Sequence, residues 1–173
     1  MDHLFLVKTF NSIREQLTII REASALLQAK KLDLNKQNNK RNIDCGRLIV
    51  FEGLDGSGKT TQILMLSEHL KRLGYKVITT REPGGTSLAE DLRKLLLNKR
   101  MNGITEMLIA FAARNDHVNK FIKPKLDEGY WVICDRFSDS TRAYQGAGRG
   151  VPLNLIDLLS EKVEENLEIS KVI

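Results

Sequence analysis

A glycine-rich segment followed by lysine and threonine holds the residue types in this sequence with the clearest chemistry. The stretch VFEGLDGSGKTTQ (50–62) contains Gly53, four residues, and then Gly58, Lys59 and Thr60. This spacing predicts a loop that binds nucleotide phosphates, because glycines let backbone N–H groups converge on phosphate oxygens without a Cβ atom in the way. The lysine would reach the β- and γ-phosphates, and the threonine hydroxyl would bind Mg²⁺. The residues expected to contact the nucleotide are Gly53, Gly56, Ser57, Gly58, Lys59, Thr60 and Thr61.

The elements around this loop fit the motif. The apolar run LIVFEG (48–53) predicts a strand, and KTTQILMLSEHLKRLG (59–74) predicts an amphipathic helix that stops at Gly74. Further strands are expected at YKVITT (75–80) and YWVICD (130–135), with helices between them. Strands that alternate with helices predict a parallel sheet covered on both faces. The expected fold is therefore a P-loop NTPase-type three-layer α/β/α arrangement.

Local signals predict where three other helices begin or end. Ser87 and Glu90 have the spacing of a capping box at the start of the helix in 86–97. Pro124 is expected to bend or end the long helix that begins near residue 104. Pro152 is expected in the first turn of a last helix, because proline lacks an N–H group that this turn does not need.

Residues 1–46 differ from residues 47–173 in the pattern of apolar and polar residues. Apolar residues recur at spacings of three and four in 10–32, which predicts a helix, and the polar, asparagine-rich stretch after it is typical of a linker. No chemistry is visible there, so we interpret 1–46 as an N-terminal extension and 47–173 as the nucleotide-binding domain. A docking helix and a non-native extension are the favoured interpretations, and a basic nucleic-acid arm is a minor one.

Composition excludes several classes of protein. The net charge of +5 fits binding of acidic small molecules and does not require nucleic acid. Cys45 and Cys134 are far apart and lack CxxC spacing, which argues against a metal site or a disulfide framework and favours a reducing, cytoplasmic compartment. Cys134 is expected to be a buried free thiol. No apolar run approaches the 18 or so residues of a membrane span.

Three later segments end or follow the predicted strands. They are REPGGT (81–86), DRF (135–137) and STRAYQGAGRG (140–150), the last expected to be a glycine-rich basic loop. Ligands of open α/β sheets lie at the carboxyl ends of the strands, so these segments and the phosphate loop should converge on one crevice. A guanine-reading NKxD motif is lacking, since Asn98-Lys99-Arg100-Met101 has no Asp, which lowers the GTPase hypothesis.

Together these segments resemble the bacterial thymidylate kinase family, whose members phosphorylate dTMP with ATP. The resemblance is carried by FEGLDGSGKTTQ, REPGGT, AAR, CDRF and DSTRAYQGAGRG, in this order, and runs from about residue 47 to residue 173. It implies ATP-dependent phosphorylation of dTMP to dTDP, with ATP and Mg²⁺ bound and with no nucleic-acid or membrane partner. A kinase for another nucleoside monophosphate, and a non-catalytic remnant that still binds phosphate, are the alternatives.

The resemblance also implies which residues hold the acceptor's sugar and phosphate. Asp55 resembles the carboxylate that approaches the 3′-hydroxyl of dTMP. Arg81, Arg93 and Arg136 resemble phosphate contacts, and guanidinium groups suit this role because they match phosphate oxygens in pairs and keep their charge. Asp135 resembles a residue near the substrate phosphate and Mg²⁺, which Thr60 would also bind. A plain surface residue is the alternative for Arg93.

A second group of residues resembles those that read the base and the deoxyribose. Arg114 resembles the arginine that binds the thymine ring, Thr141 and Gln145 resemble polar groups on the same base, and Tyr144 resembles the aromatic that favours deoxyribose. A packing role is the alternative for Tyr144. The family usually stacks an aromatic on thymine four residues before this arginine. Phe111 lies three before it, so both stacking and core packing are open.

The segment QGAGRG (145–150) resembles a lid that closes over ATP. In the bacterial type the phosphate loop has glycine where other members carry a basic residue, and the lid supplies the catalytic arginine; Gly56 and Arg149 fit this pattern. The residues expected to act in catalysis are Lys59, Arg136 and Arg149.

The resemblance stops before the family's later strands. The family sheet has strand order 2-3-1-4-5, and the sequence up to NLEISKVI (166–173) predicts only strands 2, 3 and 1, so LIVFE (48–52) would be an edge. A long apolar edge strand favours aggregation. We therefore expect a C-terminally truncated member that is inactive or poorly folded by itself. The family forms homodimers, so both a monomer and a homodimer stay open.

Overall fold

The computed structural model describes residues 46–173. The predicted helix in 10–32 and the polar stretch after it lie outside the described residues. The division of the chain at residue 46 therefore stays a prediction.

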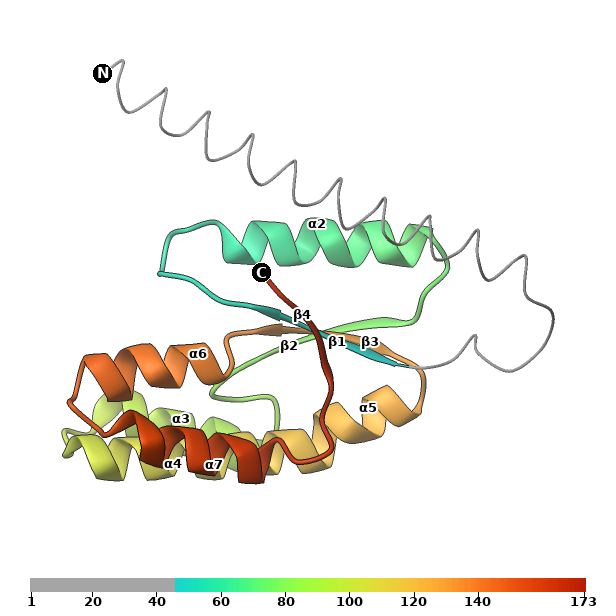
Figure 1. The fold of residues 1–173 in the computed structure, drawn as a ribbon. Helices are drawn as coiled ribbons and strands as arrows, with labels where there is room; N and C mark the ends of the chain where they lie inside the picture. Colours follow the sequence, from blue (N-terminus) through green and yellow to red (C-terminus); the bar gives the residue numbers. More distant parts are fainter. Residues whose placement is uncertain (1–45) are drawn as a thin grey trace, which may run out of the picture. The chain divides into compact units, whose positions relative to one another are not determined.

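The centre of the domain is a parallel sheet of four strands (Figure 1). The strands are β1 (Arg47–Phe51), β2 (Val77–Arg81), β3 (Trp131–Asp135) and β4 (Ile169–Val172), in the order β2-β3-β1-β4. β1 pairs in parallel with β3 on one side and with β4 on the other. The carboxyl ends of β1, β2 and β3 therefore meet at one edge of the sheet, as the sequence predicted.

The sequence prediction that β1 is an edge strand is wrong. β4 covers that side: the Glu52 N–H donates to the Ile173 carbonyl at 2.8 Å, and the Ile173 N–H donates to the Val50 carbonyl at 2.9 Å. The segment was missed because ISKV is short and mostly exposed, and only Ile169 is packed against the core. Since β1 is paired on both sides, the main reason for expecting a poorly folded domain no longer applies.

Removal of residues 169–173 is expected to lower the free energy of unfolding by about 2 kcal/mol or more. The truncation removes several backbone hydrogen bonds, each with a net value of about 0.5–1.5 kcal/mol, and it exposes the apolar edge of β1. Urea unfolding followed by circular dichroism measures the change, with Lys171→Ala as the control that alters only an exposed side chain. An unchanged urea midpoint after truncation would contradict a stabilising β4.

Helices cover both faces of the sheet, which confirms the three-layer arrangement (Figure 1). Among the described residues, α2 (Lys59–Arg72) lies on one face, and the remaining helices lie on the other. These are α3 (Ser87–Asn98), α4 (Gly103–His117), α5 (Lys123–Asp127), α6 (Ser138–Thr141) and α7 (Leu153–Val163). The core between β1, β3 and these helices contains Leu48, Val50, Val118, Ile122, Val132, Cys134 and Phe137, all buried.

The start of α3 corrects a detail of the sequence analysis. Thr86 is the N-cap, and its hydroxyl accepts a hydrogen bond from the Ala89 N–H at 3.2 Å. The predicted capping box at Ser87 is therefore wrong by one residue. Glu90 instead reaches back to accept from the Gly85 N–H at 3.1 Å, a contact outside the helix that spacing alone did not indicate.

Two segments wind as π-helices near the predicted site. Val118–Ile122 joins α4 to α5, so the α-helix ends at His117, while helical winding continues and Pro124 lies in the first turn of α5. Arg142–Ala147 continues α6 as a second π-helix, and the prediction of a loop over 140–150 is wrong for its first eight residues. Glycines suggested a loop there, but Gly146 is buried against Leu153 and Ile156, and a Cβ atom at this position would require the Leu153 side chain to shift.

The N-cap of α7 is Pro152, one position before the predicted first turn. Gly74 follows the end of α2 with φ 87°, as a helix C-terminal glycine should. No helix among residues 46–173 is both long and apolar enough to cross a bilayer.

Candidate functional site

The loop between β1 and α2 has the geometry of a phosphate cradle. Gly53 and Gly58 have φ of 141° and 89°, values that side chains with a Cβ atom rarely adopt, and Gly58 is the N-cap of α2. The residues of the loop from 53 to 58 are exposed, and so are Thr60 and Thr61 in the first turn of α2. The predicted phosphate loop, including Gly56 and Ser57, is therefore accessible at a helix N-terminus, where an anion is favoured.

Lys59 folds its side chain back over this loop. Its Nζ donates to the carbonyls of Gly53 at 2.8 Å and Leu54 at 2.7 Å. These hydrogen bonds hold the ammonium group directly above the cradle. A bound phosphate would find this cation beside the backbone N–H groups, as the motif requires.

Arg136 connects the phosphate loop with the end of β3. Its Nη2 forms an ion pair with Asp55 Oδ1 at 2.6 Å, and its Nη1 donates to Ser140 Oγ at 3.2 Å. The guanidinium lies 5.3 Å from the centre of the Tyr144 ring. Arg136 also has φ 72°, a left-handed backbone that turns the chain sharply after the strand. The structure thus brings three predicted site residues, Asp55, Arg136 and Tyr144, into one cluster.

Glu52 anchors the turn that carries Arg136, and sequence reasoning missed it. One carboxylate oxygen accepts from the N–H groups of Phe137 at 2.8 Å and Ser140 at 3.2 Å, and the other accepts from Ser140 Oγ at 2.6 Å. Ser140 in turn accepts from Arg136. Glu52 directly follows the apolar strand β1, and this position was the signal that could have identified it.

Asp135 ends β3 beside this turn, and one of its carboxylate oxygens has an unusual environment. Its Oδ1 atom is buried and lacks a hydrogen-bonding partner among the described residues. A buried carboxylate oxygen is costly without a partner. The atom is therefore suited to a cation or to a hydrogen-bond donor supplied by a ligand.

Arg114 of α4 lies in a second, buried cluster. Its Nε donates to Glu82 Oε2 at 2.6 Å, and its Nη2 donates to Thr141 Oγ1 at 3.0 Å. The rings of Phe111 and Phe137 lie 5.2 and 4.9 Å from the guanidinium carbon. The structure therefore joins the predicted residues Arg114 and Thr141.

Phe111 packs into the core rather than lying on the surface. It is 4% exposed and contacts Met107, Val151 and Ile156. Of the two roles left open for this ring, core packing is the one that the structure shows, and its further contact is with Arg114.

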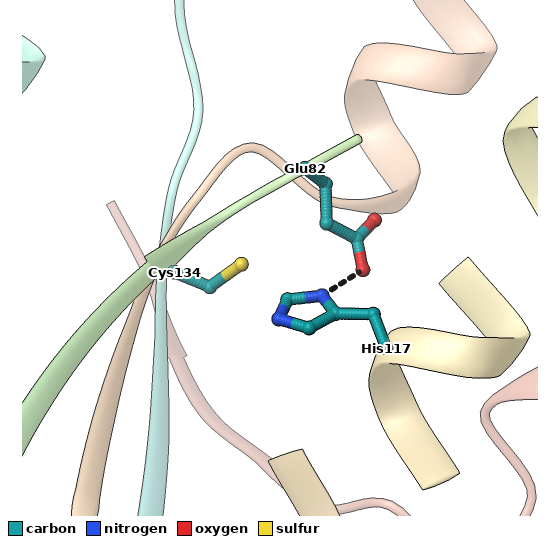
Figure 2. Close-up of side chains that lie close together, drawn as sticks. All are labelled: Glu82, His117 and Cys134. Carbon is teal, nitrogen blue, oxygen red and sulfur yellow. Dashed lines mark hydrogen bonds and ion pairs between the residues drawn. The ribbon is translucent and has the colours of Figure 1, made fainter. Parts of the chain in front are cut away.

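Figure 2 shows Glu82, His117 and Cys134 pointing toward one another beneath the end of β2. His117 Nδ1 lies 3.1 Å from Glu82 Oε1, and His117 Nε2 lies 2.7 Å from Thr80 Oγ1. The Cys134 thiol donates to the Arg136 carbonyl at 3.2 Å. Although one ligand atom from each of the three residues lies within 4.8 Å of the others, each atom already has a protein partner. We therefore interpret the cluster as a hydrogen-bonding network rather than a metal site.

Burial raises the pKa of the Cys134 thiol well above its ordinary value. A protonated thiol is a poor nucleophile, so Cys134 should resist thiol reagents in the native protein. In the variant Cys45→Ser, which leaves Cys134 as the single thiol, we expect no reaction with Ellman's reagent until guanidinium is added. Rapid reaction of the folded variant would show that the site opens or that the thiol is ionised.

Arg81 and Arg93 border the loop between β2 and α3. Arg81 forms an ion pair with Glu90 at 3.0 Å, and Arg93 Nη1 donates to the Pro83 carbonyl at 2.8 Å. The pKa of Glu90 is lowered, chiefly by the Gly85 N–H and also by Arg81. Arg93 is therefore not a plain surface residue, because it braces the loop that follows Arg81.

Glu106 of α4 contacts Gln145 and Arg149, the two predicted site residues not yet described. Gln145 Nε2 donates to Glu106 Oε1 at 2.8 Å, and Arg149 Nε lies 3.1 Å from Glu106 Oε2. Arg149 is thus paired with α4 and not with the phosphate loop, while its side chain stays 56% exposed. Gln145 lies in the second π-helix and is buried, whereas Arg149 remains accessible.

The protein-family model described as "Thymidylate kinase" matches residues 51–168, which is more than half of the chain. The chain belongs to the thymidylate kinase family. This match confirms the resemblance read from the sequence motifs. The matched range includes the phosphate loop, the Arg136 turn and the Arg114 cluster.

Individual family members agree with this assignment. The chain is 47% identical to thymidylate kinase of Ralstonia pickettii over 132 residues, covering 74% of this chain and 64% of that one. It is 51% identical to thymidylate kinase of Cupriavidus metallidurans over 123 residues, covering 71% and 61%. The chain thus spans about three fifths of the length of these curated relatives.

A solved structure supports the fold. Thymidylate kinase from Ehrlichia chaffeensis superposes with a TM-score of 0.69 at 45% sequence identity, covering 73% of this chain and 74% of that one. This similarity confirms the P-loop α/β fold predicted from the alternation of strands and helices.

Proposed function

We propose that this protein transfers the γ-phosphoryl group of ATP to the 5′-phosphate of dTMP, giving dTDP and ADP. The observation that carries the proposal is the Arg136–Asp55 ion pair. It joins the phosphate loop to the end of β3 in a chain of the thymidylate kinase family. One guanidinium beside the cradle offers a place for a second phosphate next to the first.

The donor side of the proposed site is the phosphate loop. Gly53, Gly56, Ser57 and Gly58 would present the backbone around the ATP phosphates, with Thr60 and Thr61 at the helix N-terminus. Lys59 would exchange its carbonyl partners for the β- and γ-phosphates, a stronger charge-assisted contact. Magnesium fits here, because Asp135 has a buried oxygen without a partner among residues 46–173, and Thr60 is exposed. When bound, the ion would neutralise phosphate charge.

The acceptor side is proposed along β2, β3 and α4. Arg136 would release Asp55 to bind the dTMP phosphate, leaving the Asp55 carboxylate free to accept from the 3′-hydroxyl. Arg81 at the end of β2 and Arg93 of α3 would supply further positive charge. Arg114, Thr141 and Gln145 would read the base, and Tyr144 would lie by the deoxyribose.

The transfer itself needs little covalent chemistry from the protein. An oxygen of the dTMP phosphate forms the new bond to the γ-phosphorus while the bond to the ADP oxygen breaks. The acceptor is already anionic, so no general base is required. The protein's contribution is to hold the two phosphates in line and to neutralise the developing charge, with Lys59, Arg136 and Arg149 as the cations.

Other aspects of the proposal rest on the family. A homodimer and a cytoplasmic location are proposed from family membership, and the buried, unpaired Cys134 is consistent with a reducing compartment. No nucleic-acid partner is proposed, because the charged residues of the site are accounted for by two nucleotides.

The experiment is to incubate the purified chain with ATP and Mg²⁺ and with each of dTMP, dUMP, dCMP and AMP, and to separate the products by ion-exchange chromatography. We expect dTDP to form fastest. Faster conversion of another nucleotide would overturn the choice of acceptor. Binding of dTMP in a calorimeter without any product would instead identify a chain that binds phosphate but does not catalyse transfer.

A further inference from the structure

Arg114 is a buried charge that must be neutralised by the protein. Its side chain is 4% exposed, and the partner carboxylate of Glu82 is 3% exposed. A buried guanidinium without a partner would be strongly destabilising, so the 2.6 Å contact between Nε and Oε2 fixes where this side chain lies. Glu82 directly follows β2, and its position is therefore set by the sheet.

The orientation of the guanidinium is determined on nearly every side. Nε is bound by Glu82 and Nη2 by Thr141, and aromatic rings lie near the guanidinium carbon. Nη1 has no hydrogen-bonding partner among the described residues, and the nearest recorded carboxylate oxygen, on Glu164, is 3.9 Å away. That distance is too long for a hydrogen bond. One nitrogen of a rigidly held guanidinium is thus left for an acceptor from a ligand.

His117 in turn orients Glu82. Its ring lies between Glu82 Oε1 and the Thr80 hydroxyl, and a Cβ atom at Gly85 would overlap it, so it has little freedom to move. The arrangement in which every group is satisfied has the Thr80 hydroxyl donating to Nε2 and the Nδ1–H donating to Glu82. Both oxygens of Glu82 then accept one hydrogen bond each, one from His117 and one from Arg114.

We propose that Glu82, oriented by His117, is a positioning residue that presents Nη1 of Arg114 to a carbonyl oxygen on the base of the acceptor nucleotide. This inference rests on the proposed function for the identity of the base. It assigns roles to two residues that do not touch the nucleotide themselves. Figure 2 shows how the carboxylate of Glu82 and the imidazole of His117 come from separate elements to meet in the core.

Glu82→Gln is the substitution that tests the positioning role of Glu82 most directly. A carboxylate accepts from both neighbours, whereas an amide offers one oxygen and one NH₂ group, so it cannot accept from Arg114 Nε and from His117 Nδ1 through separate oxygens. We expect dTMP to bind about tenfold more weakly or worse, since hydrogen bonds to charged groups are the strong ones. The dissociation constant for ATP should stay within about twofold, because the phosphate loop is not part of this network.

The experiment uses the full chain and two readouts. The first is the Nε–Hε signal of Arg114 in ¹⁵N-correlated NMR spectra, assigned from its loss in Arg114→Lys; this signal reports the contact with Glu82 without any ligand. The second is calorimetric titration with dTMP and with ATP. Asp116→Asn is the matched control. It is also an acid-to-amide change, on the helix α4 that carries Arg114, but the partners of Asp116 are Thr86 and Lys120 and not Arg114.

A second pair of variants keeps the test decisive if Glu82→Gln does not fold. In His117→Asn the side-chain nitrogen can take the place of Nδ1 and donate to Glu82, whereas in His117→Leu no donor remains. We expect the asparagine variant to keep the Arg114 signal and to bind dTMP within about threefold of the wild type, and the leucine variant to lose both.

The outcomes separate the inference from the function it rests on. Loss of the Arg114 signal together with weaker dTMP binding, and unchanged ATP binding, supports the positioning role. A preserved signal and unchanged dTMP binding in Glu82→Gln, or equal behaviour of the two His117 variants, overturns it. A wild-type chain that shows the protected Arg114 signal but binds no dTMP would refute the proposed function while leaving the positioning of Arg114 by Glu82 supported.

Discussion

Arg149→Ala is expected to lower kcat for dTDP formation by about 10³-fold while the dissociation constant for dTMP changes by less than about threefold. An arginine that stabilises charge in phosphoryl transfer contributes roughly 10³–10⁵ in rate and acts mainly in the transition state. In the structure Arg149 is paired with Glu106 and is more than half exposed. It is therefore free to exchange this ion pair for the phosphates when both nucleotides are bound.

Arg142→Ala is the matched control, because Arg142 lies on the neighbouring π-helical segment and pairs with Asp139 and Asp157 on the surface. It should retain nearly all activity, since exposed ion pairs contribute little. Single-turnover kinetics separate transfer from binding in both variants. Loss of dTMP affinity with turnover intact in Arg149→Ala would contradict the catalytic role of the segment.

Arg136→Ala is expected to lower kcat/KM for dTMP by about 10²–10⁴-fold, mostly through weaker dTMP binding. Two charge-assisted hydrogen bonds to a phosphate, at about 1.5–3 kcal/mol each, account for this range. The left-handed backbone at φ 72° is unfavourable for alanine as it is for arginine, because both have a Cβ atom. The change therefore tests the guanidinium rather than the backbone. Initial rates at varied dTMP, with ATP saturating, give the loss.

Arg136→Lys refines this prediction. Lysine keeps the charge but cannot contact Asp55 and Ser140 at once as the guanidinium fork does, so we expect it to recover little of the activity. Arg47→Ala is the control, since Arg47 lies over the Trp131 ring at the far, amino-terminal end of the same strands. Full activity in Arg136→Ala would contradict the proposal that Arg136, which pairs with Asp55 in the structure, binds the dTMP phosphate.

The sequence predicted most of the site because its motifs are local. The phosphate loop needs only Gly53, Gly58, Lys59 and a following helix, all within one short stretch. The strand ends that carry Asp135 and Arg136 were also predictable, because parallel strands must present their carboxyl ends together. Family membership confirms the resemblance that these motifs carried.

What the sequence did not predict depends on contacts between distant segments. Glu52 is separated from Ser140 by 88 residues, and Glu82 from Arg114 by 32 and from His117 by 35. The position of Glu52 after an apolar strand was its one local signal, and nothing in the local pattern at Glu82 distinguishes a buried carboxylate from an exposed one. The winding of 138–147 and the pairing of β4 with β1 were missed for a related reason: packing of Gly146 and main-chain hydrogen bonds decide them, not composition.

The central claim is that one crevice holds the donor and acceptor phosphates together. A dinucleotide in which adenosine and thymidine are joined through five phosphates tests it directly, by calorimetric titration of the purified chain. We predict that one molecule binds per chain, at least about tenfold more tightly than either dTMP or ATP, because joining the two ligands makes the second contact intramolecular. Lys59→Ala and Arg136→Ala should each weaken this binding. A dinucleotide that binds no more tightly than the better of the two separate nucleotides would contradict the claim.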